Sequence, residues 1–141
     1  MSVDVKYRTE ATAMGGRDGW SKLDSGMLSI AMASPKELGG SGKGHNPEEL
    51  FALGYSACFL GAMKVAAANE KLGTVPDNTS VTANVGIGPR GDGGFGIAVK
   101  LTVSMPGVDR AVVEKIIERG HFVCPYSNAT KGNIAVETVL V

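Results

Sequence analysis

The sequence predicts a single α+β domain over residues 1–141, and three observations lead to this prediction. The chain has the length of one ordinary domain, and 43% of its residues are hydrophobic, which is enough to build a buried core. One long apolar segment, residues 46–72, has the start and stop signals of a helix. Short segments on both sides of it alternate polar and apolar residues, which is typical of half-buried strands.

The elements before the long helix are expected to be short strands. Residues 3–13 alternate well enough to predict a strand, and the glycine-rich turn 15–19 ends it. Two more strands are expected over 20–24 and 26–33. The segment 37–45 resembles a phosphate-binding loop only in part, since the first glycine and the Ser or Thr after the lysine are missing. We interpret this segment as a linker.

The helix over 46–72 has clear signals at both ends. Asn46 is a good N-cap, Pro47 suits the first helical position, and Glu48 complements the helix dipole. Gly73 provides a stop. The helix is apolar on nearly every side and is about 40 Å long. Because such a helix must be buried, we expect it at the centre of the domain or in an interface between subunits.

The remaining elements complete the α+β pattern. Gly86, Gly88 and Gly91 match a dinucleotide-binding motif formally, but Pro89 and the strand after it rule out the helix that this motif requires. The elements expected here are strands over 79–88 and 95–105, a helix over 110–120 capped by Asp109, an irregular segment or short helix over 121–132, and a last strand over 133–141.

Composition narrows the classes of partner. Fourteen basic residues balance fourteen acidic ones, which argues against nucleic acid and against an anionic membrane surface. The N-terminus is charged and unlike a signal peptide, and no uninterrupted apolar stretch approaches 18 residues. A cytoplasmic location is therefore expected. In that reducing compartment, two cysteines are not expected to form a permanent disulfide bond. They are either inert buried residues or reactive thiols.

The two cysteines lie in different settings. Cys58 is in the middle of the apolar helix, where a cysteine is often just a small buried apolar residue. Cys124 is followed by Pro125, which predicts that Cys124 caps a short helix. A thiol at a helix N-terminus commonly has a lowered pKa. The residues alone leave two interpretations open for each cysteine, an inert buried residue or a reactive thiol.

Other chemistry has weaker support. The cysteines are far apart and form no C-x-x-C pair, and His121 with Cys124 is only half of a zinc site. We therefore expect no metal. His121 could act as a base for Cys124, although a structural histidine is the interpretation that these residues favour. Arg17 in its turn and Glu48 in the first helical turn could each be an ordinary solvated side chain.

Two long segments resemble a known family. Residues 46–59 (NPEELFALGYSACF) and 123–134 (VCPYSNATKGNI) closely resemble the organic hydroperoxide resistance proteins, which belong to the wider family of osmotically inducible thiol peroxidases. The turn at 15–19 also fits, and the resemblance extends from about residue 3 to the C-terminus. Lys131 stands where the family often has arginine, a departure from which we expect no change in chemistry.

The resemblance implies a fold, an activity and a reductant. The fold is the OsmC-like one, a strongly curved antiparallel sheet around a long central helix, in an intertwined homodimer. The activity is that of a peroxidase that reduces alkyl and fatty-acid hydroperoxides to alcohols and protects against oxidative stress. Dihydrolipoamide or a lipoylated protein would be the external reductant, with no bound cofactor. The alternatives are an OsmC-branch peroxidase of broader substrate range, a disulfide redox sensor without turnover, and a structural domain with inert cysteines.

The resemblance also implies a role for four residues. Cys58 matches the cysteine that attacks the peroxide, and Cys124 matches the one that resolves the sulfenic acid into a disulfide. Arg17 and Glu48 match the pair that polarises the site. Glu48 and Cys58 are ten positions apart, about 15 Å along one helix. Our hypothesis is therefore that Arg17 and Glu48 approach Cys58 of the partner subunit.

Overall fold

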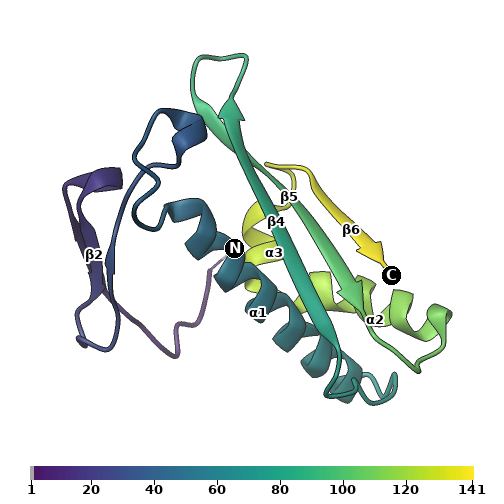
Figure 1. Cartoon of the computed structure of the whole chain (residues 1–141). Coiled ribbons are helices and arrows are strands. Elements are labelled where there is room, and N and C mark those ends of the chain that lie inside the picture. The colour runs from purple at the N-terminus through teal and green to yellow at the C-terminus, as the bar shows by residue number, and fades with distance from the viewer. Residues whose placement is uncertain (1) are drawn as a thin grey trace. The chain divides into compact units, whose positions relative to one another are not determined.

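The structure, a computed structural model, describes residues 2–141 and confirms the α+β class (Figure 1). Its residues form two compact units, one up to Leu50 and one from Phe51 to Val141. The helix α1, Pro47–Asn69, starts in the first unit and belongs mainly to the second. Each unit is described by itself below.

The first unit contains a small antiparallel sheet of the strands β1 (Ala11–Met14), β2 (Trp20–Leu23) and β3 (Ser29–Ala31), in the order β1-β2-β3. A short 3₁₀ turn, η1 (Gly16–Asp18), joins β1 to β2, and a second one, η2 (Lys36–Leu38), lies in the glycine-rich segment before α1. This order confirms the three predicted strands before the long helix.

The first strand is much shorter than predicted. Regular pairing begins at Ala11, opposite Leu23, and residues 2–10 have no strand partner in this unit and are exposed. Alternation of polar and apolar residues creates a strand only where a neighbour accepts its backbone hydrogen bonds. Since β2 ends at Leu23, the prediction of a strand from residue 3 is wrong for the isolated chain. The strand predicted over 26–33 is likewise limited to Ser29–Ala31.

The predicted start of α1 is confirmed. The backbone N–H of Glu49 donates to Asn46 Oδ1 at 2.9 Å, and Asn46 Nδ2 donates to the Glu49 carboxylate at 3.2 Å. This reciprocal arrangement satisfies a backbone donor that the first turn would otherwise leave unpaired. The helix ends at Asn69, a few residues before Gly73, whose φ of 122° requires glycine.

One side of α1 is buried and the other is exposed. Its buried residues are Tyr55, Phe59, Ala62, Met63, Ala66 and Ala67. Leu53, at 68% exposure, and Val65 lie on the outer side, so the single chain buries only one side of the helix, and burial of the other side in an interface stays a prediction. By length and by a mean hydropathy of 1.5, α1 also meets the criteria for a membrane-spanning helix, criteria that the core helix of a soluble protein meets as well.

The second unit contains a three-stranded sheet in the order β4-β5-β6, formed by β4 (Ser80–Pro89), β5 (Phe95–Ser104) and β6 (Val136–Leu140). β4 and β5 form the predicted antiparallel pair, but β6 runs parallel to β5, unlike the antiparallel sheet that we expected. The reason is the connection, because the chain crosses over through α2 (Arg110–Val123) and α3 (Pro125–Thr130) between the two strands. Asp109 caps α2 as predicted, accepting from the Ala111 N–H.

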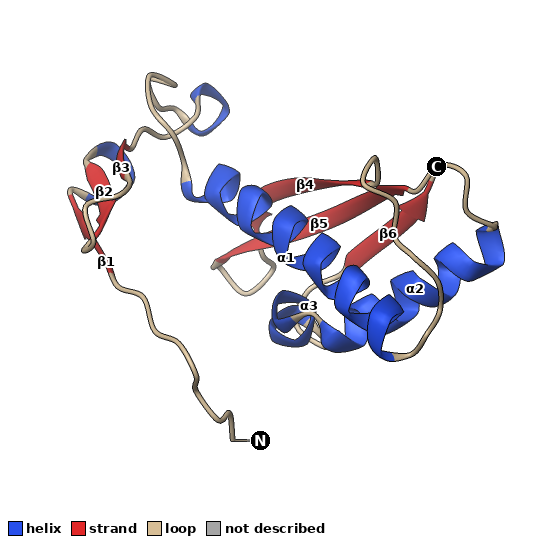
Figure 2. Cartoon of the chain, turned by 90° about the horizontal axis from the view of Figure 1, so that it is seen from below, coloured by secondary structure: helices blue, strands red, loops and turns tan. Residues whose placement is uncertain are grey.

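The core of this unit lies between the sheet and the helices. Figure 2 shows α1, α2 and α3 on the same side of the sheet. Alternate residues of β5 point into the core, while Lys100 between them faces outward and is exposed. The most deeply buried side chains of this core are Tyr55, Phe59, Met63, Leu101, Val103, Val113, Ile116 and Cys124. Two of the four candidate site residues, Cys58 and Cys124, therefore lie at or in the core.

Candidate functional site

The two cysteines are in contact. The thiol of Cys124 donates to Cys58 Sγ over a sulfur–sulfur distance of 3.6 Å, and both cysteines are free thiols. Cys58 comes from the middle of α1, and Cys124 lies at the junction of α2 and α3. Cys124 is fully buried, whereas Cys58 is half-buried. Of this pair, only Cys58 is partly exposed to solvent.

Cys124 caps α3, as the sequence predicts. The backbone N–H of Ser127 donates to Cys124 Sγ at 3.5 Å, and Pro125 occupies the first helical position. The sulfur thus accepts the hydrogen bond that a Ser or Asp oxygen accepts at most N-caps. The backbone amide of Tyr126, one residue earlier, interacts with Cys58. Both sulfurs therefore face the first turn of α3, whose free N–H groups favour negative charge.

The pKa of the Cys58 thiol is nevertheless raised. Burial is the largest cause, because it removes water from a thiolate. The Tyr126 amide opposes this effect, and the neighbouring Cys124 sulfur adds to it. None of the causes is a cation. The second unit by itself therefore holds Cys58 in the protonated form, which is a poor nucleophile.

Arg17 and Glu48 form a bidentate ion pair in the first unit. Arg17 Nη1 and Nη2 donate to the two carboxylate oxygens of Glu48 at 2.9 and 2.7 Å. The side chain of Glu48 is 12% exposed and that of Arg17 is 40% exposed. The hydrogen bond from Arg17 lowers the pKa of Glu48 and the same bond raises the pKa of Arg17. The ion pair that the resemblance implies is thus present, and its two hydrogen bonds fix the orientation of the guanidinium.

The turn that carries Arg17 depends on its glycines. Gly15 and Gly16 have φ of 77° and 59°, values that favour glycine. At Gly19, a Cβ would overlap with the Met14 carbonyl oxygen and would lie 2.8 Å from Gly15 Cα. These constraints explain why this glycine-rich turn can present the arginine at one defined place.

His121 has a structural setting. Its Nδ1 lies 2.8 Å from Ser127 Oγ and its Nε2 lies 2.8 Å from Thr138 Oγ1, so both nitrogens are occupied by hydroxyl groups. The ring packs on Phe59 with a centroid distance of 4.4 Å. Burial lowers the pKa of His121. The structure thus confirms the interpretation of His121 as a satisfied structural histidine, and the alternative of a base paired with Cys124 is wrong.

A metal site has no support in the geometry. Within residues 2–141, no three His, Cys, Asp or Glu side chains gather as potential ligands. Nδ1 of His45, the other histidine of the chain, lies 2.8 Å from a carboxylate oxygen of Glu49.

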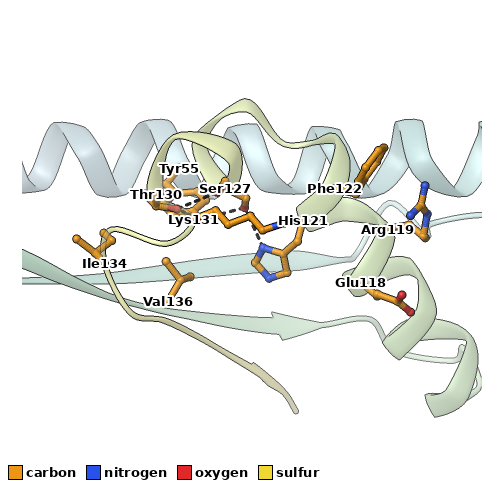
Figure 3. A pocket seen from close by; sticks show the side chains of 10 residues that line it. All are labelled: Tyr55, Glu118, Arg119, His121, Phe122, Ser127, Thr130, Lys131, Ile134 and Val136. Atoms are coloured by element: carbon orange, nitrogen blue, oxygen red, sulfur yellow. Dashed lines mark hydrogen bonds between the residues drawn. The ribbon is translucent and has the colours of Figure 1, made fainter. Parts of the chain in front are cut away.

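A cavity of about 480 Å³ lies beside α3 in the second unit (Figure 3). Tyr55, Ser127 and Thr130, which carry hydroxyl groups, form part of its wall, and Ser127 is the residue whose backbone N–H donates to Cys124 Sγ. Sequence reasoning missed these hydroxyls. The spacing of Ser127 and Thr130, three residues apart just after Cys124, was the available signal. The lining residues are Tyr55, Glu118, Arg119, His121, Phe122, Ser127, Thr130, Lys131, Ile134 and Val136.

Comparisons with known proteins show which proteins this chain is similar to. The family model described as "OsmC-like protein" matches residues 40–139. The organic hydroperoxide resistance protein of Xanthomonas axonopodis pv. citri is 49% identical over 96% of this chain and 95% of its own length. A putative organic hydroperoxide resistance protein from Vibrio cholerae has a solved structure with a TM-score of 0.92 and 40% identity, covering 99% of this chain and 95% of its own. One from Elizabethkingia anophelis reaches a TM-score of 0.90 at 45% identity, covering 98% of both chains.

Proposed function

Because the chain belongs to the OsmC-like family and, within it, to the organic hydroperoxide resistance proteins, we propose that it is a peroxidase that reduces organic hydroperoxides through its two cysteines. A role in resistance to organic peroxides follows from the family. The cysteine mechanism is our proposal, and the contact between the two sulfurs at 3.6 Å is the observation that carries it.

The first step takes place at Cys58, the sulfur that solvent can reach. Its thiolate attacks one oxygen of the hydroperoxide, forming an S–O bond as the O–O bond breaks. The sulfur becomes a sulfenic acid, and the leaving alkoxide takes up a proton and departs as the alcohol. Cys58 is thereby oxidised by two electrons and the peroxide is reduced by two.

The second step closes a disulfide. The sulfur of Cys124 attacks Cys58 Sγ, the S–O bond breaks, and the proton of the Cys124 thiol leaves with the hydroxyl group as water. Attack in line with the S–O bond requires the oxygen to point away from Cys124. The peroxide should therefore approach Cys58 from the side opposite to Cys124, and no large movement of either helix is needed.

The thiolate of Cys58 needs a cation. Burial raises its pKa and no cation in the second unit compensates. We propose that Arg17 of the partner subunit supplies the charge, with Glu48 orienting its guanidinium. Glu48 and Cys58 are on the same helix but ten positions apart, about 15 Å along its axis. We therefore expect an arginine that is bound to Glu48 of one subunit to lie close to Cys58 of the other subunit.

A homodimer accounts for two features of the single chain. Residues 2–10 alternate like a strand but have no pairing partner in their unit, and the outer side of α1 exposes Leu53 and Val65. Both features resemble surfaces that a second copy covers. An intertwined homodimer, as the family resemblance implies, would pair the strand and bury the helix.

Recycling requires a dithiol. The reductant's thiolate attacks the disulfide, and its second thiol then releases the enzyme in the dithiol form. We propose dihydrolipoamide or a lipoylated protein in this role and a cytoplasmic location, because the cytosol is a reducing compartment. No bound cofactor takes part in these steps.

Turnover distinguishes the possible functions. We expect the protein to consume many equivalents of an alkyl or fatty-acid hydroperoxide in the presence of dihydrolipoamide and to produce the alcohol. A redox sensor would consume one equivalent and stop, and a domain with inert cysteines would consume none. Hydrogen peroxide as a parallel substrate tests the OsmC-branch alternative, because a broader substrate range would show comparable rates for both peroxides.

A further inference from the structure

We propose that Ser127 is a positioning residue for the resolving thiol. A directional chain of hydrogen bonds through its hydroxyl group holds the first turn of α3, and with it Cys124, against Cys58 on α1. This inference rests on the proposed function and deepens it, because it names the group that aligns the two thiols for disulfide closure.

Ser127 joins three elements at one point. It is the third residue of α3 and is buried, and its backbone N–H donates to Cys124 Sγ at 3.5 Å. Its hydroxyl oxygen lies 2.9 Å from the hydroxyl of Tyr55 on α1 and 2.8 Å from Nδ1 of His121 on α2 (Figure 3). One side chain therefore ties the helix that bears the resolving thiol to both helices on which it packs.

The contact on α1 lies beside the attacking cysteine. Tyr55 is fully buried and precedes Cys58 by three positions, so the two side chains share a face of the helix. The ring of Tyr126 packs on Tyr55 and Phe51, each with centroids 5.7 Å away, and fills the space next to this contact. The Ser127–Tyr55 bond thus runs next to the sulfur–sulfur contact and connects the same two helices.

The number of available hydrogens determines which group donates in each hydrogen bond of this network. The hydroxyl of Thr130 lies 3.0 Å from the carbonyl oxygen of Tyr126, which can only accept, so Thr130 donates there. The Tyr55 hydroxyl, 3.3 Å from Thr130 Oγ1, must then donate to Thr130. Since each hydroxyl has a single hydrogen, Ser127 must donate to Tyr55.

The same count extends to His121. Because the hydrogen of Ser127 points to Tyr55, His121 must donate its Nδ1 hydrogen to Ser127 Oγ. In the neutral ring, which burial favours, the other nitrogen, Nε2, accepts from the hydroxyl of Thr138 on β6. The ring is neutral in this arrangement, in agreement with the lowered pKa of His121. Every contact contains one hydrogen, so the whole chain has one consistent direction from β6 to the backbone of α3.

Removing the hydroxyl of Ser127 breaks this chain in the middle. Ser127→Ala leaves the Nδ1 hydrogen of His121 without an acceptor and the Tyr55 oxygen without a donor. The backbone N–H of residue 127, which donates to Cys124 Sγ, remains. α3 has six residues, too few for a helix that is stable without tertiary contacts. Its first turn should therefore lose its fixed distance to α1, and a misalignment of about 1 Å can slow a reaction by up to ~100-fold.

The first experiment needs no peroxide. Equilibration of the protein in glutathione redox buffers measures the effective concentration of one thiol at the other. We expect Ser127→Ala to lower this effective concentration about tenfold and Tyr55→Phe to lower it by a smaller factor. Ser127→Thr, which keeps a hydroxyl group, should have the wild-type value. Thr79→Val, which removes a buried hydroxyl that has no partner within residues 2–141, is the matched control and should leave it unchanged. An effective concentration in Ser127→Ala equal to that of the wild type overturns the proposal.

The second experiment separates closure from peroxide reduction. In a single turnover with an alkyl hydroperoxide, dimedone labelling of Ser127→Ala should show a sulfenic acid on Cys58 that persists about tenfold longer than in the wild type. Equal slowing of peroxide consumption and closure would instead indicate a general structural role and overturn the proposal. If Ser127→Ala does not fold, Tyr55→Phe decides by the same criteria. A wild type that consumes no hydroperoxide overturns the proposed peroxidase function, and the glutathione equilibrium still decides the role of Ser127.

Discussion

Cys58 and Cys124 are separated by 66 positions in the chain, yet their sulfur atoms lie 3.6 Å apart. Because a disulfide bond is about 2.05 Å long, the two sulfurs need to approach by only about 1.5 Å to become bonded. One sulfur is half-buried and the other is fully buried. This difference in exposure supports the unequal roles that we propose for the two thiols and leads to the first prediction.

Replacing each cysteine should have a different effect. We expect Cys58→Ser to abolish peroxide consumption, because it removes the sulfur that the peroxide reaches. Cys124→Ser should still consume one equivalent and accumulate a sulfenic acid, because only the resolving step is lost. Mass spectrometry of the protein after one equivalent of hydroperoxide measures both outcomes. The assignment of roles is wrong if Cys58→Ser remains fully active.

Removing the guanidinium of Arg17 should make Cys58 less reactive. If Arg17 stabilises the thiolate and the leaving alkoxide, Arg17→Ala should slow peroxide reduction by ~100-fold or more. The pH at which Cys58 becomes alkylated by iodoacetamide should rise at the same time. Glu48→Gln should have a smaller effect, because it keeps the arginine but loses the bidentate ion pair.

The ion pair of Arg90 with Asp92 provides a matched control. It is an exposed arginine–carboxylate contact in the turn between β4 and β5. Arg90→Ala should leave both the peroxidase rate and the alkylation profile of Cys58 as in the wild type. Since exposed ion pairs contribute less than about 1 kcal/mol, Arg90→Ala should change the unfolding free energy little. An unchanged alkylation profile in Arg17→Ala contradicts the role proposed for this arginine.

Local signals explain which parts of the fold could be predicted from the sequence. Asn46 and Pro47 define the start of α1, and Asp109 that of α2, because capping depends on residues within one turn. The bounds of β1 and the direction of β6 depend on partner strands that are distant in sequence. The prediction of β1 from residue 3 was too long for this reason, and the parallel pairing of β6 was not foreseen.

In the candidate site too, local sequence predicts some features, while others depend on residues that are distant in the chain. The N-cap role of Cys124 follows from Pro125 beside it, whereas the contact of Cys124 with Cys58 depends on the packing of α3 against α1. The family resemblance, not spacing, suggested the pair of Arg17 and Glu48. Ser127 was missed although its spacing from Thr130 was an available signal, because its importance comes from three elements that meet only in the folded chain.

His121 should make the stability of the protein depend on pH. Burial lowers its pKa in the folded state below the ordinary value of 6.5, so below that pH the unfolded chain binds more protons. The stabilisation from this group is therefore complete above about pH 6.5. It is lost as the pH falls through the folded-state pKa, with a slope of at most ~1.4 kcal/mol per pH unit for one proton.

Urea unfolding between pH 5 and pH 8 measures this slope. We expect His121→Asn to be less stable than the wild type at pH 8, because it breaks the bonds to Ser127 and Thr138, but to lose less stability on acidification. His45→Gln removes the other histidine of the chain, which lies outside the core, and serves as the control. The same acid-dependent loss in His121→Asn as in the wild type would show that another group is responsible.

Gly19 should be essential for the presentation of Arg17. A Cβ at this position would overlap with the carbonyl oxygen of Met14 and would lie 2.8 Å from Gly15 Cα, both backbone atoms that cannot move unless the turn opens. We therefore expect Gly19→Ala to lower peroxidase activity about as much as Arg17→Ala does. The helical circular dichroism should remain, because the three α-helices lie later in the chain, from Pro47 onward.

Gly16→Ala is the control for this turn. Gly16 has a φ of 59°, which costs an alanine about 1–2 kcal/mol, but nothing lies within 4 Å of a Cβ built there. The variant should be strained yet keep the ion pair of Arg17 with Glu48 and most of the activity. Comparison of the two alanine variants separates backbone strain from steric overlap. If Gly16→Ala and Gly19→Ala lose activity equally, the strain of the turn as a whole, and not the close approach of Gly19 to Met14, controls the placement of Arg17.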